Sequence, residues 1–268
     1  MSSDLEFAVG LADLADELSL ARFGASDLHV ETKPDLSPVT EADRAIEQAL
    51  REHIAAERPG DSVLGEEEGS SGTGGRRWIL DPIDGTRNYS RGIPIFATLI
   101  ALEVDGEVEL GLVSAPALGR RWWAERGKGA HRTGGPIRVS AVEKLEDATV
   151  SIGWGQKMKV SQVERLEDAV VSFELSEGIE RLAPLTERAW HTRSFGDFWQ
   201  HMLVAEGSVE VAIDPAVKIW DCAPLKIIVE EAGGKFTDMS GRAVIDGGSG
   251  VSTNGLLHAE VLVALGVG

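Results

Sequence analysis

One six-residue stretch limits what this chain can fold into more than any other feature of the sequence. The apolar run 78–80 predicts a buried strand and leads directly into Asp81-Pro82-Ile83-Asp84-Gly85-Thr86. Pro82 has no backbone N–H to donate to a sheet ladder, so we expect the strand to end there. The chain must then turn sharply, which places several oxygen atoms at the carboxyl end of the strand.

The residue types in this turn predict a site for a cation and a phosphate. Asp81, Asp84 and the Ile83 carbonyl offer oxygen ligands, which hard cations such as Mg²⁺ prefer. Gly85 permits a close approach of the backbone, and a short helix beginning near Thr86 would point free N–H groups at an anion. An acidic β-turn without any ligand explains an isolated Asp-Pro-x-Asp-Gly about equally well.

Composition narrows the class of protein. The 268 residues, 43% of them hydrophobic, suffice for one large domain or two modest ones with a substantial core. A formal net charge of -18 argues against a nucleic-acid partner, and acidic residues near a pocket would suit divalent cations or a cationic substrate. The single cysteine, Cys222, leaves no disulfide framework and no zinc cluster. No stretch reaches the roughly 20 apolar residues of a membrane span, so we expect a cytoplasmic protein without a membrane partner.

The first half of the chain predicts helices followed by antiparallel strands. Apolar residues at helical spacing predict helices over 5–23 and 40–56. A flexible Gly/Ser-rich loop is expected over 70–75. Strands are expected over 97–102, 109–114 and 121–125, with a hairpin turn at Asp105-Gly106.

From about Glu146 the pattern becomes that of an α/β segment. Strands are expected over 148–152 and 209–213, and helices over 160–175 and 222–232. No long polar linker separates the halves. We therefore expect two subdomains, 1–145 and 146–268, with the site between them.

Asp221 is a second candidate site residue, far from the first motif in the sequence. It follows Trp220 and precedes a helix whose first turn contains Pro224, which predicts that Asp221 is the N-cap. Capping alone would explain an aspartate at this position.

Three ordered motifs make the chain resemble the inositol monophosphatase family of metal-dependent sugar-phosphate phosphatases. They are Gly65-Glu66-Glu67, the 81–86 motif, and Trp220-Asp221-Cys222-Ala223 followed by Glu230-Glu231-Ala232-Gly233-Gly234. The resemblance runs from about Ala8 to the C-terminus and includes the stretch 39–43. It implies an α+β fold, a layered αβαβα sandwich, that forms a homodimer and hydrolyses a small phosphate monoester with two or three Mg²⁺ ions.

The resemblance also implies which residues bind the metals. Glu66, Asp81 and the Ile83 carbonyl match the ligands of the first metal. The ligands of the second metal match Asp81, Asp84 and Asp221. Most ligands then belong to the 1–145 subdomain, and Asp221 belongs to the 146–268 subdomain together with the residues that select the substrate.

Further roles carry over to the phosphate and the attacking water. Gly85 and Thr86 match backbone N–H donors to the phosphate, and Thr86 with Asp43 matches a hydroxyl–carboxylate pair that orients the water. With Glu66, these two residues are the expected catalytic groups. Lys33 lies where the family often has a lysine near the site.

The segment around Gly196 predicts which phosphate ester is hydrolysed. Inositol phosphatases carry small residues after this glycine, whereas Asp197, Phe198 and Trp199 stand here. Asp214, seven residues before Asp221, matches a family carboxylate that meets the substrate. Together with the segment 116–123, this pattern is most similar to the bacterial histidinol-phosphate phosphatases of this fold.

The resemblance implies the reaction of L-histidinol phosphate and water to L-histidinol and phosphate, a step of histidine biosynthesis. Arg193, Asp197 and Asp214 are the expected substrate-binding residues. The two carboxylates could pair with the ammonium and imidazole groups of the substrate, while one aromatic ring packs on the imidazole. A helix cap would explain Asp197 as well, and core packing would explain at least one of the two aromatic residues.

Two alternatives remain open from the sequence. The first is an inositol-1-phosphate phosphatase or a broad sugar-phosphate phosphatase of the same family. The second is a metal-binding regulatory protein that keeps the fold without turnover. No catalytic position is lost from the sequence, which argues against the second alternative.

Overall fold

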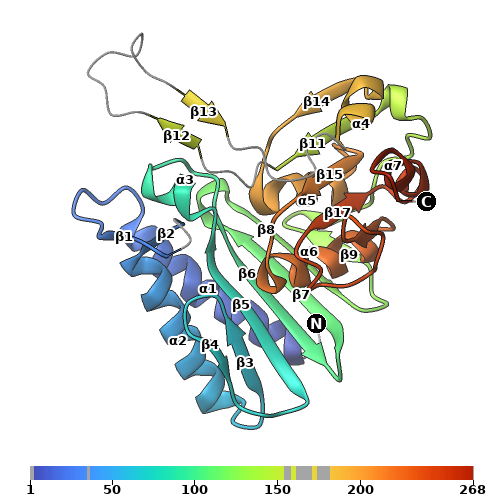
Figure 1. Cartoon of the computed structure of the whole chain (residues 1–268). Helices are drawn as coiled ribbons and strands as arrows, with labels where there is room; N and C mark the ends of the chain where they lie inside the picture. Colours follow the sequence, from blue (N-terminus) through green and yellow to red (C-terminus); the bar gives the residue numbers. More distant parts are fainter. Residues whose placement is uncertain (1–2, 35–36, 154–157, 161–170, 174–181, 268) are drawn as a thin grey trace.

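Consecutive residues are apolar and buried along the central strands, so both faces of each sheet can be buried. In strand β5 (Arg76–Asp84), Trp78 and Leu80 pack on one side, and Ile79 packs on the opposite side. A sheet that is apolar on both faces needs a helical layer on each side. The computed structural model describes residues 3–34, 37–153, 158–160, 171–173 and 182–267, and it has these layers (Figure 1).

The molecule contains five layers in the order αβαβα. Helices α1 (Ser3–Arg22) and α2 (Glu41–Glu57) cover the outer face of an eight-stranded sheet. Helices α5 (Asp197–Ala205) and α6 (Ile219–Glu231) lie between this sheet and a five-stranded sheet. Helices α4 (Ala183–Arg188) and α7 (His258–Ala264) cover the far face of the second sheet. The predicted layered α+β fold is therefore confirmed.

The large sheet has the strand order β10-β9-β8-β7-β6-β5-β3-β4, and only β3 and β5 pair in parallel. Its strands other than β5 are β3 (Ser62–Gly65), β4 (Gly69–Ser71), β6 (Ala97–Val104), β7 (Glu107–Ala115), β8 (Arg120–Glu125), β9 (Ala130–Arg132) and β10 (Gly135–Pro136). The Asp105-Gly106 turn joins β6 to β7 as predicted. Both of its residues have positive φ angles, 52° and 88°, as the tight hairpin requires.

The second sheet has the order β14-β11-β15-β17-β16, with parallel and antiparallel pairs. Its strands are β11 (Thr149–Ile152), β14 (His191–Arg193), β15 (Val211–Asp214), β16 (Lys235–Thr237) and β17 (Gly250–Thr253). Two short strand pairs lie outside the two sheets: β1 (Val30–Thr32) pairs with β2 (Pro38–Thr40), and β12 (Met158–Val160) pairs with β13 (Val171–Phe173). The remaining described elements are helix α3 (Thr86–Ser90) and the 3₁₀ turns at Pro116–Leu118 and Leu145–Asp147.

The predicted boundary at 145/146 falls between the two sheets, and a division into subdomains stays a prediction. Among the described residues, no helix is long and apolar enough to cross a membrane.

Three local predictions differ from the structure. β5 does not end at Pro82 but continues to Asp84, because a shift of register against β6 between Asp81 and Asp84 accommodates the proline. The expected loop at 70–75 begins as strand β4, which pairs with β3. The expected helix at 160–175 is wrong at Val160 and Val171–Phe173, which are strand residues, and its other residues lie outside the described ones. A short apolar run does not distinguish a helix from a strand.

Gly111 in β7 lies directly under α6, and replacing it with alanine should destabilise the fold. An added Cβ atom would lie 2.6 Å from Ile227 Cγ2 and 2.7 Å from Pro224 O. We expect Gly111→Ala to lower the free energy of unfolding by about 1–3 kcal/mol, measured by urea denaturation. Gly10→Ala is the control, because Gly10 is exposed in α1 with no atom within 4 Å of the added Cβ. It should raise stability slightly, and equal effects of the two variants would contradict this packing argument.

Candidate active site

Three carboxylates from distant parts of the chain meet at one point. Asp81 and Asp84 lie near the end of β5, and Asp221 lies in the first turn of α6. One oxygen atom from each residue lies within 4.8 Å of the other two. The motif 81–86 and Asp221 therefore form one site, as the sequence predicts.

Burial and repulsion between like charges together disfavour the ionised form of these acids. Asp81 is 2% exposed, and its Oδ1 has no hydrogen-bond partner among the described residues. Burial raises the pKa of Asp81 well above its ordinary value, and the charges of Glu66, Asp84 and Asp221 add to the effect. Burial raises the pKa of Asp84 in the same way, with a contribution from Asp197. A buried carboxylate oxygen without a partner, surrounded by other acids, is a donor set that fits a divalent cation.

Asp221 is not the N-cap of its helix, which corrects the sequence prediction. α6 begins at Ile219 with Lys218 as N-cap, so Asp221 lies inside the first turn. Its Oδ2 accepts a hydrogen bond of 2.7 Å from the Lys218 backbone N–H. This contact fixes the carboxylate at the helix start by the reciprocal half of a capping box. Burial raises the pKa of Asp221 to about 7, and the charge of Glu66 acts in the same direction.

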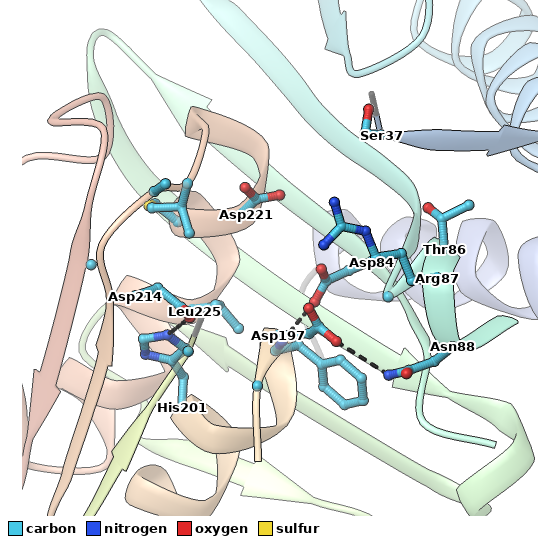
Figure 2. Close-up of a pocket in the computed structure, with 18 of the residues that line it drawn as sticks. Ser37, Asp84, Thr86, Arg87, Asn88, Asp197, His201, Asp214, Asp221 and Leu225 are labelled. Atoms are coloured by element: carbon cyan, nitrogen blue, oxygen red, sulfur yellow. Dashed lines mark hydrogen bonds and ion pairs between the residues drawn. The ribbon is translucent and has the colours of Figure 1, made fainter. Parts of the chain in front are cut away.

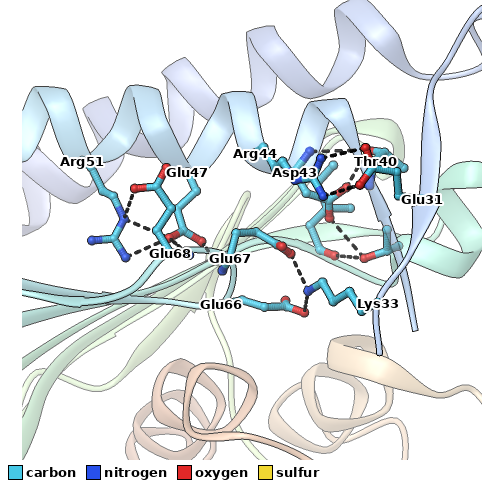
Figure 3. Close-up of polar contacts among 12 residues, drawn as sticks. Glu31, Lys33, Thr40, Asp43, Arg44, Glu47, Arg51, Glu66, Glu67 and Glu68 are labelled. Atoms are coloured by element: carbon cyan, nitrogen blue, oxygen red, sulfur yellow. Dashed lines mark hydrogen bonds and ion pairs between the residues drawn. The ribbon is translucent and has the colours of Figure 1, made fainter. Parts of the chain in front are cut away.

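Glu66 follows β3 and lies beside a lysine. Its backbone N–H donates to Leu80 O at 3.2 Å, which ties the turn to β5. Lys33 Nζ lies 2.7 Å from Glu66 Oε1 and 2.6 Å from Glu67 Oε1 (Figure 3). Burial by itself would lower the pKa of Lys33, but the hydrogen bonds to both glutamates raise it. A positive charge therefore lies next to a predicted metal ligand.

Asp43 and Thr86 form the expected hydroxyl–carboxylate pair. The Thr86 Oγ1 lies 3.2 Å from Asp43 Oδ1 and 2.9 Å from the Ile83 carbonyl oxygen. Thr40, the N-cap of α2, donates its backbone N–H and its hydroxyl to Asp43 Oδ2, at 2.8 Å and 2.5 Å. These contacts hold a carboxylate that is 1% exposed, and burial raises the pKa of Asp43.

A cavity of 440 Å³ joins these groups to residues of the second half of the chain (Figure 2). Glu66, Asp84, Gly85, Thr86, Asp197, Asp214 and Asp221 are among its lining residues. Gly85 has a φ angle of +86°, and an added Cβ atom would lie 2.9 Å from Ile95 O. Only glycine fits this position, so the backbone before α3 can border the cavity closely.

Asp197 begins α5 in an unusual backbone conformation. Its φ angle is 49°, and Gly196 is the N-cap, so the cap alternative for Asp197 is wrong. Asn88 Nδ2 donates to Asp197 Oδ2 at 3.2 Å, and the Phe198 backbone N–H donates to Asp84 Oδ2 at 2.6 Å. The start of α5 is thereby joined to the carboxylate group at the end of β5.

Asp214 lies on the opposite wall of the cavity and is held by two neighbours. His201 Nε2 is 2.9 Å and Gln200 Nε2 is 2.7 Å from Asp214 Oδ2. A Cβ atom at Gly153 would lie 1.5 Å from Asp214 Oδ1, so only glycine leaves room for the carboxylate. Although Asp197 keeps contact with solvent, desolvation within the cavity raises its pKa to about 6, with a contribution from Asp214.

The structure does not bring every predicted substrate residue to the cavity. Arg193 is exposed in β14, and the described lining includes its neighbour Ser194 instead. Phe198 is among the lining residues and is also fully buried, which confirms core packing for one aromatic residue. Trp199 packs against the same core and is absent from the described lining. Arg87, expected on the surface, is exposed and also lines the cavity.

His201 was not recognised as a site residue from the sequence. It lines the cavity, and its Nδ1 lies 2.7 Å from Ser252 Oγ. A usable signal was present, because His201 stands four residues after Asp197 and the two therefore share a helix face. A search for metal-ligand spacing among histidines alone does not detect it.

Comparisons with known proteins agree with this geometry. The family model described as the inositol monophosphatase family matches residues 1–265. A histidinol-phosphatase from Mycobacterium tuberculosis is 50% identical, covering 99% of this chain and 98% of the relative. A histidinol-phosphatase from Streptomyces coelicolor is 47% identical, covering 97% and 95%. The solved structure of Thermotoga maritima IMPase TM1415 has a TM-score of 0.82 and 32% identity, covering 99% and 97%.

The carboxylate group should make the metal-free protein less stable as pH rises. The pKa of Asp221 is raised from 3.8 to about 7 in the folded state, so the folded protein binds more protons than the unfolded chain between these values. The contribution of protonated Asp221 to the stability of the folded protein is complete below pH 3.8 and is lost as pH rises through about 7. Bound Mg²⁺ should remove this penalty, so calorimetry should find a larger increase in Tm on adding Mg²⁺ at about pH 8 than at about pH 5.

Asp221→Asn provides the control for this measurement. Without the titrating group, the Tm in EDTA should fall less between the two pH values than in the unchanged protein. An equal fall in both proteins would show that the pH dependence originates elsewhere.

Proposed function

The chain belongs to the inositol monophosphatase family, and from this premise we propose that it is a Mg²⁺-dependent phosphatase that hydrolyses histidinol phosphate. The observation that carries the proposal is the composition of the cavity wall. The cavity is lined by the carboxylate group at the end of β5, by Asp197, which adjoins that group through Asn88 and Phe198, and by Asp214 on the opposite wall. The carboxylate group suits metal ions with a phosphate, and Asp197 together with Asp214 suits a leaving group with two cationic nitrogens.

The metal sites follow from the donor set. Asp81, Asp84, Glu66 and Asp221 supply carboxylate oxygens, and Ile83 supplies its carbonyl. Hard oxygen donors without sulfur or imidazole favour Mg²⁺ over softer metals. Two or three bound Mg²⁺ ions would offset the charge of the phosphate, lower the pKa of a water and stabilise the leaving oxygen.

The protein groups position the reaction around these metals. Thr86, in contact with Asp43, orients a water for attack on phosphorus opposite the leaving oxygen. The backbone N–H groups of Gly85 and Thr86 lie at the start of α3 and bind the phosphate oxygens. The water adds its oxygen to phosphorus, the ester P–O bond breaks, and the departing alcohol oxygen takes a proton. The products are inorganic phosphate and histidinol.

Substrate selection is assigned to Asp197 and Asp214. Asp197 and Asp214 pair with the ammonium and the imidazolium of histidinol, since both carboxylates line the cavity. His201 and Gln200 hold Asp214 in place. Arg193 is not needed in this arrangement, and Arg87, which lines the cavity, is better placed to meet an anionic group.

The alternatives are weaker on specific grounds. An inositol phosphatase would bind neutral hydroxyl groups and carries a small residue after the glycine that matches Gly196, whereas this cavity presents the further carboxylate of Asp197. A silent regulatory protein would have no need for the Thr86–Asp43 pair beside an intact group of metal ligands. A homodimer and a cytoplasmic location are part of this proposal as expectations of the family.

Asp197→Asn should weaken binding of histidinol phosphate specifically. Asparagine tolerates the positive φ angle of residue 197 and can still accept from Asn88, so the backbone should not change. Loss of one ion pair should raise KM for histidinol phosphate about 10-fold or more. The kcat/KM for an aryl phosphate whose aryl group carries no charge should change little. Phosphate release with both substrates and with inositol-1-phosphate measures this. Equal losses on all substrates, or no activity of the unchanged protein on histidinol phosphate, would contradict the substrate assignment.

Asp84→Asn should abolish Mg²⁺-dependent hydrolysis while the fold persists. The change removes a charged ligand from the group of three carboxylates and also lessens repulsion in the metal-free protein. We expect at least a 100-fold lower kcat and an equal or higher Tm in EDTA. Asp105→Asn, in the distant hairpin turn where asparagine is tolerated, should leave both quantities unchanged. Substantial activity in Asp84→Asn would rule out the two-metal arrangement.

A further inference from the structure

Glu47 is a fully buried carboxylate that neither lines the cavity nor belongs to the predicted metal ligands. It lies on the inner face of α2 with an exposed fraction of 0%. A buried charge is costly unless every oxygen is satisfied by a partner. The partners of Glu47 therefore show which part of the structure this charge serves.

Both oxygens of Glu47 accept hydrogen bonds from the backbone of the metal-ligand turn. The Glu67 N–H donates to Oε2 at 2.7 Å, and the Glu68 N–H donates to Oε1 at 3.0 Å. These two N–H groups directly follow Glu66, whose own N–H donates to Leu80 O on the other side. The Glu66 backbone is thus held from both sides, by α2 and by β5.

Arg51 completes the arrangement one helical turn after Glu47 (Figure 3). Its Nε donates to Glu47 Oε1 at 2.8 Å, its NH2 nitrogen donates to Gly69 O at 2.5 Å, and its NH1 nitrogen donates to Ser71 Oγ at 3.0 Å. The ion pair therefore clamps the turn from Glu67 to Ser71 onto α2. Gly65 leaves the space for it, because an added Cβ atom would lie 2.2 Å from Glu47 Oε1.

Stability alone does not explain such a buried pair. Apolar residues of similar volume usually stabilise a core equally well or better than a buried ion pair. They could not accept two backbone N–H groups, however, and so could not fix the direction of the turn. The specific effect of Glu47 is to orient the residue that comes just before those two N–H groups.

We propose that Glu47 is a positioning residue for metal binding, which acts by fixing the backbone that carries Glu66. This rests on the proposed function only in that Glu66 binds a divalent cation. Lys33 contacts the carboxylates of Glu66 and Glu67, whereas Glu47 accepts from the backbone that follows Glu66. Of these two residues, Glu47 is the one that fixes the backbone.

Calorimetric titration of Mg²⁺ into the metal-free protein, without substrate, tests the proposal. Glu47→Gln keeps one acceptor oxygen and replaces the other with an NH₂ group that cannot accept a backbone N–H. We expect Mg²⁺ binding about 10–100-fold weaker at the site that uses Glu66, with kcat at saturating Mg²⁺ close to that of the unchanged protein. Val261→Ala is the control, since it removes buried apolar atoms from α7 on the far face of the second sheet, and its Mg²⁺ affinity should be unchanged.

The outcomes separate this inference from the proposed function. Unchanged Mg²⁺ affinity in Glu47→Gln, with a loss of stability like that of Val261→Ala, would show a purely structural role and overturn the inference. Absence of Mg²⁺ binding in the unchanged protein would overturn the proposed function itself. If Glu47→Gln does not fold, Arg51→Gln decides, because it releases the same carboxylate and the Gly69 carbonyl from their shared partner. Weakened Mg²⁺ binding in that variant supports the positioning role, and unchanged binding overturns it.

Discussion

The close approach of Asp81, Asp84 and Asp221 is the constraint around which the rest of the structure is arranged. Three carboxylates within 4.8 Å of one another repel strongly, and burial raises all three pKa values: that of Asp221 to about 7, and those of Asp81 and Asp84 well above the ordinary value. A fold can hold them together only if rigid elements fix each one separately. Here a bulged strand and a helix start provide that rigidity, and both are anchored in the apolar core between the two sheets.

Backbone hydrogen bonds hold several of the acids in place. Asp221 accepts from the Lys218 N–H, and Asp84 accepts from the N–H that follows Asp197. Glu47 does the same for the turn that carries Glu66. Backbone donors are fixed by the secondary structure, so they orient a carboxylate without supplying a positive charge that would compete with a metal. Local backbone geometry, more than ion pairing, therefore preorganises this site.

The sequence predicted the reaction centre better than its surroundings, for physical reasons. The 81–86 motif was informative because its proline, glycine and two acids leave few local conformations. The strand nevertheless continues past Pro82 through a bulge, which depends on pairing with β6 and is not visible in the local sequence. The roles of Glu47 and His201 depend on contacts 20 and 13 residues away along the chain, which spacing alone does not show. The predicted helix at 160–175 failed at Val171–Phe173 because a short apolar run fits both periodicities.

In the proposed function, the chemistry and the choice of substrate come mostly from different halves of the chain. The proposed metal ligands and the Thr86–Asp43 pair come mostly from the first half, and the acids proposed to face the leaving group come from α5 and β15. Asp221 is the exception, since it joins the carboxylate group from the second half. Because α6 carries Asp221 and packs on the same core as α5, the carboxylate group and the two selecting acids share one rigid support. A side-chain change at Asp197 that keeps the α5 backbone in place should therefore alter which ester is bound while the attack geometry at phosphorus stays the same.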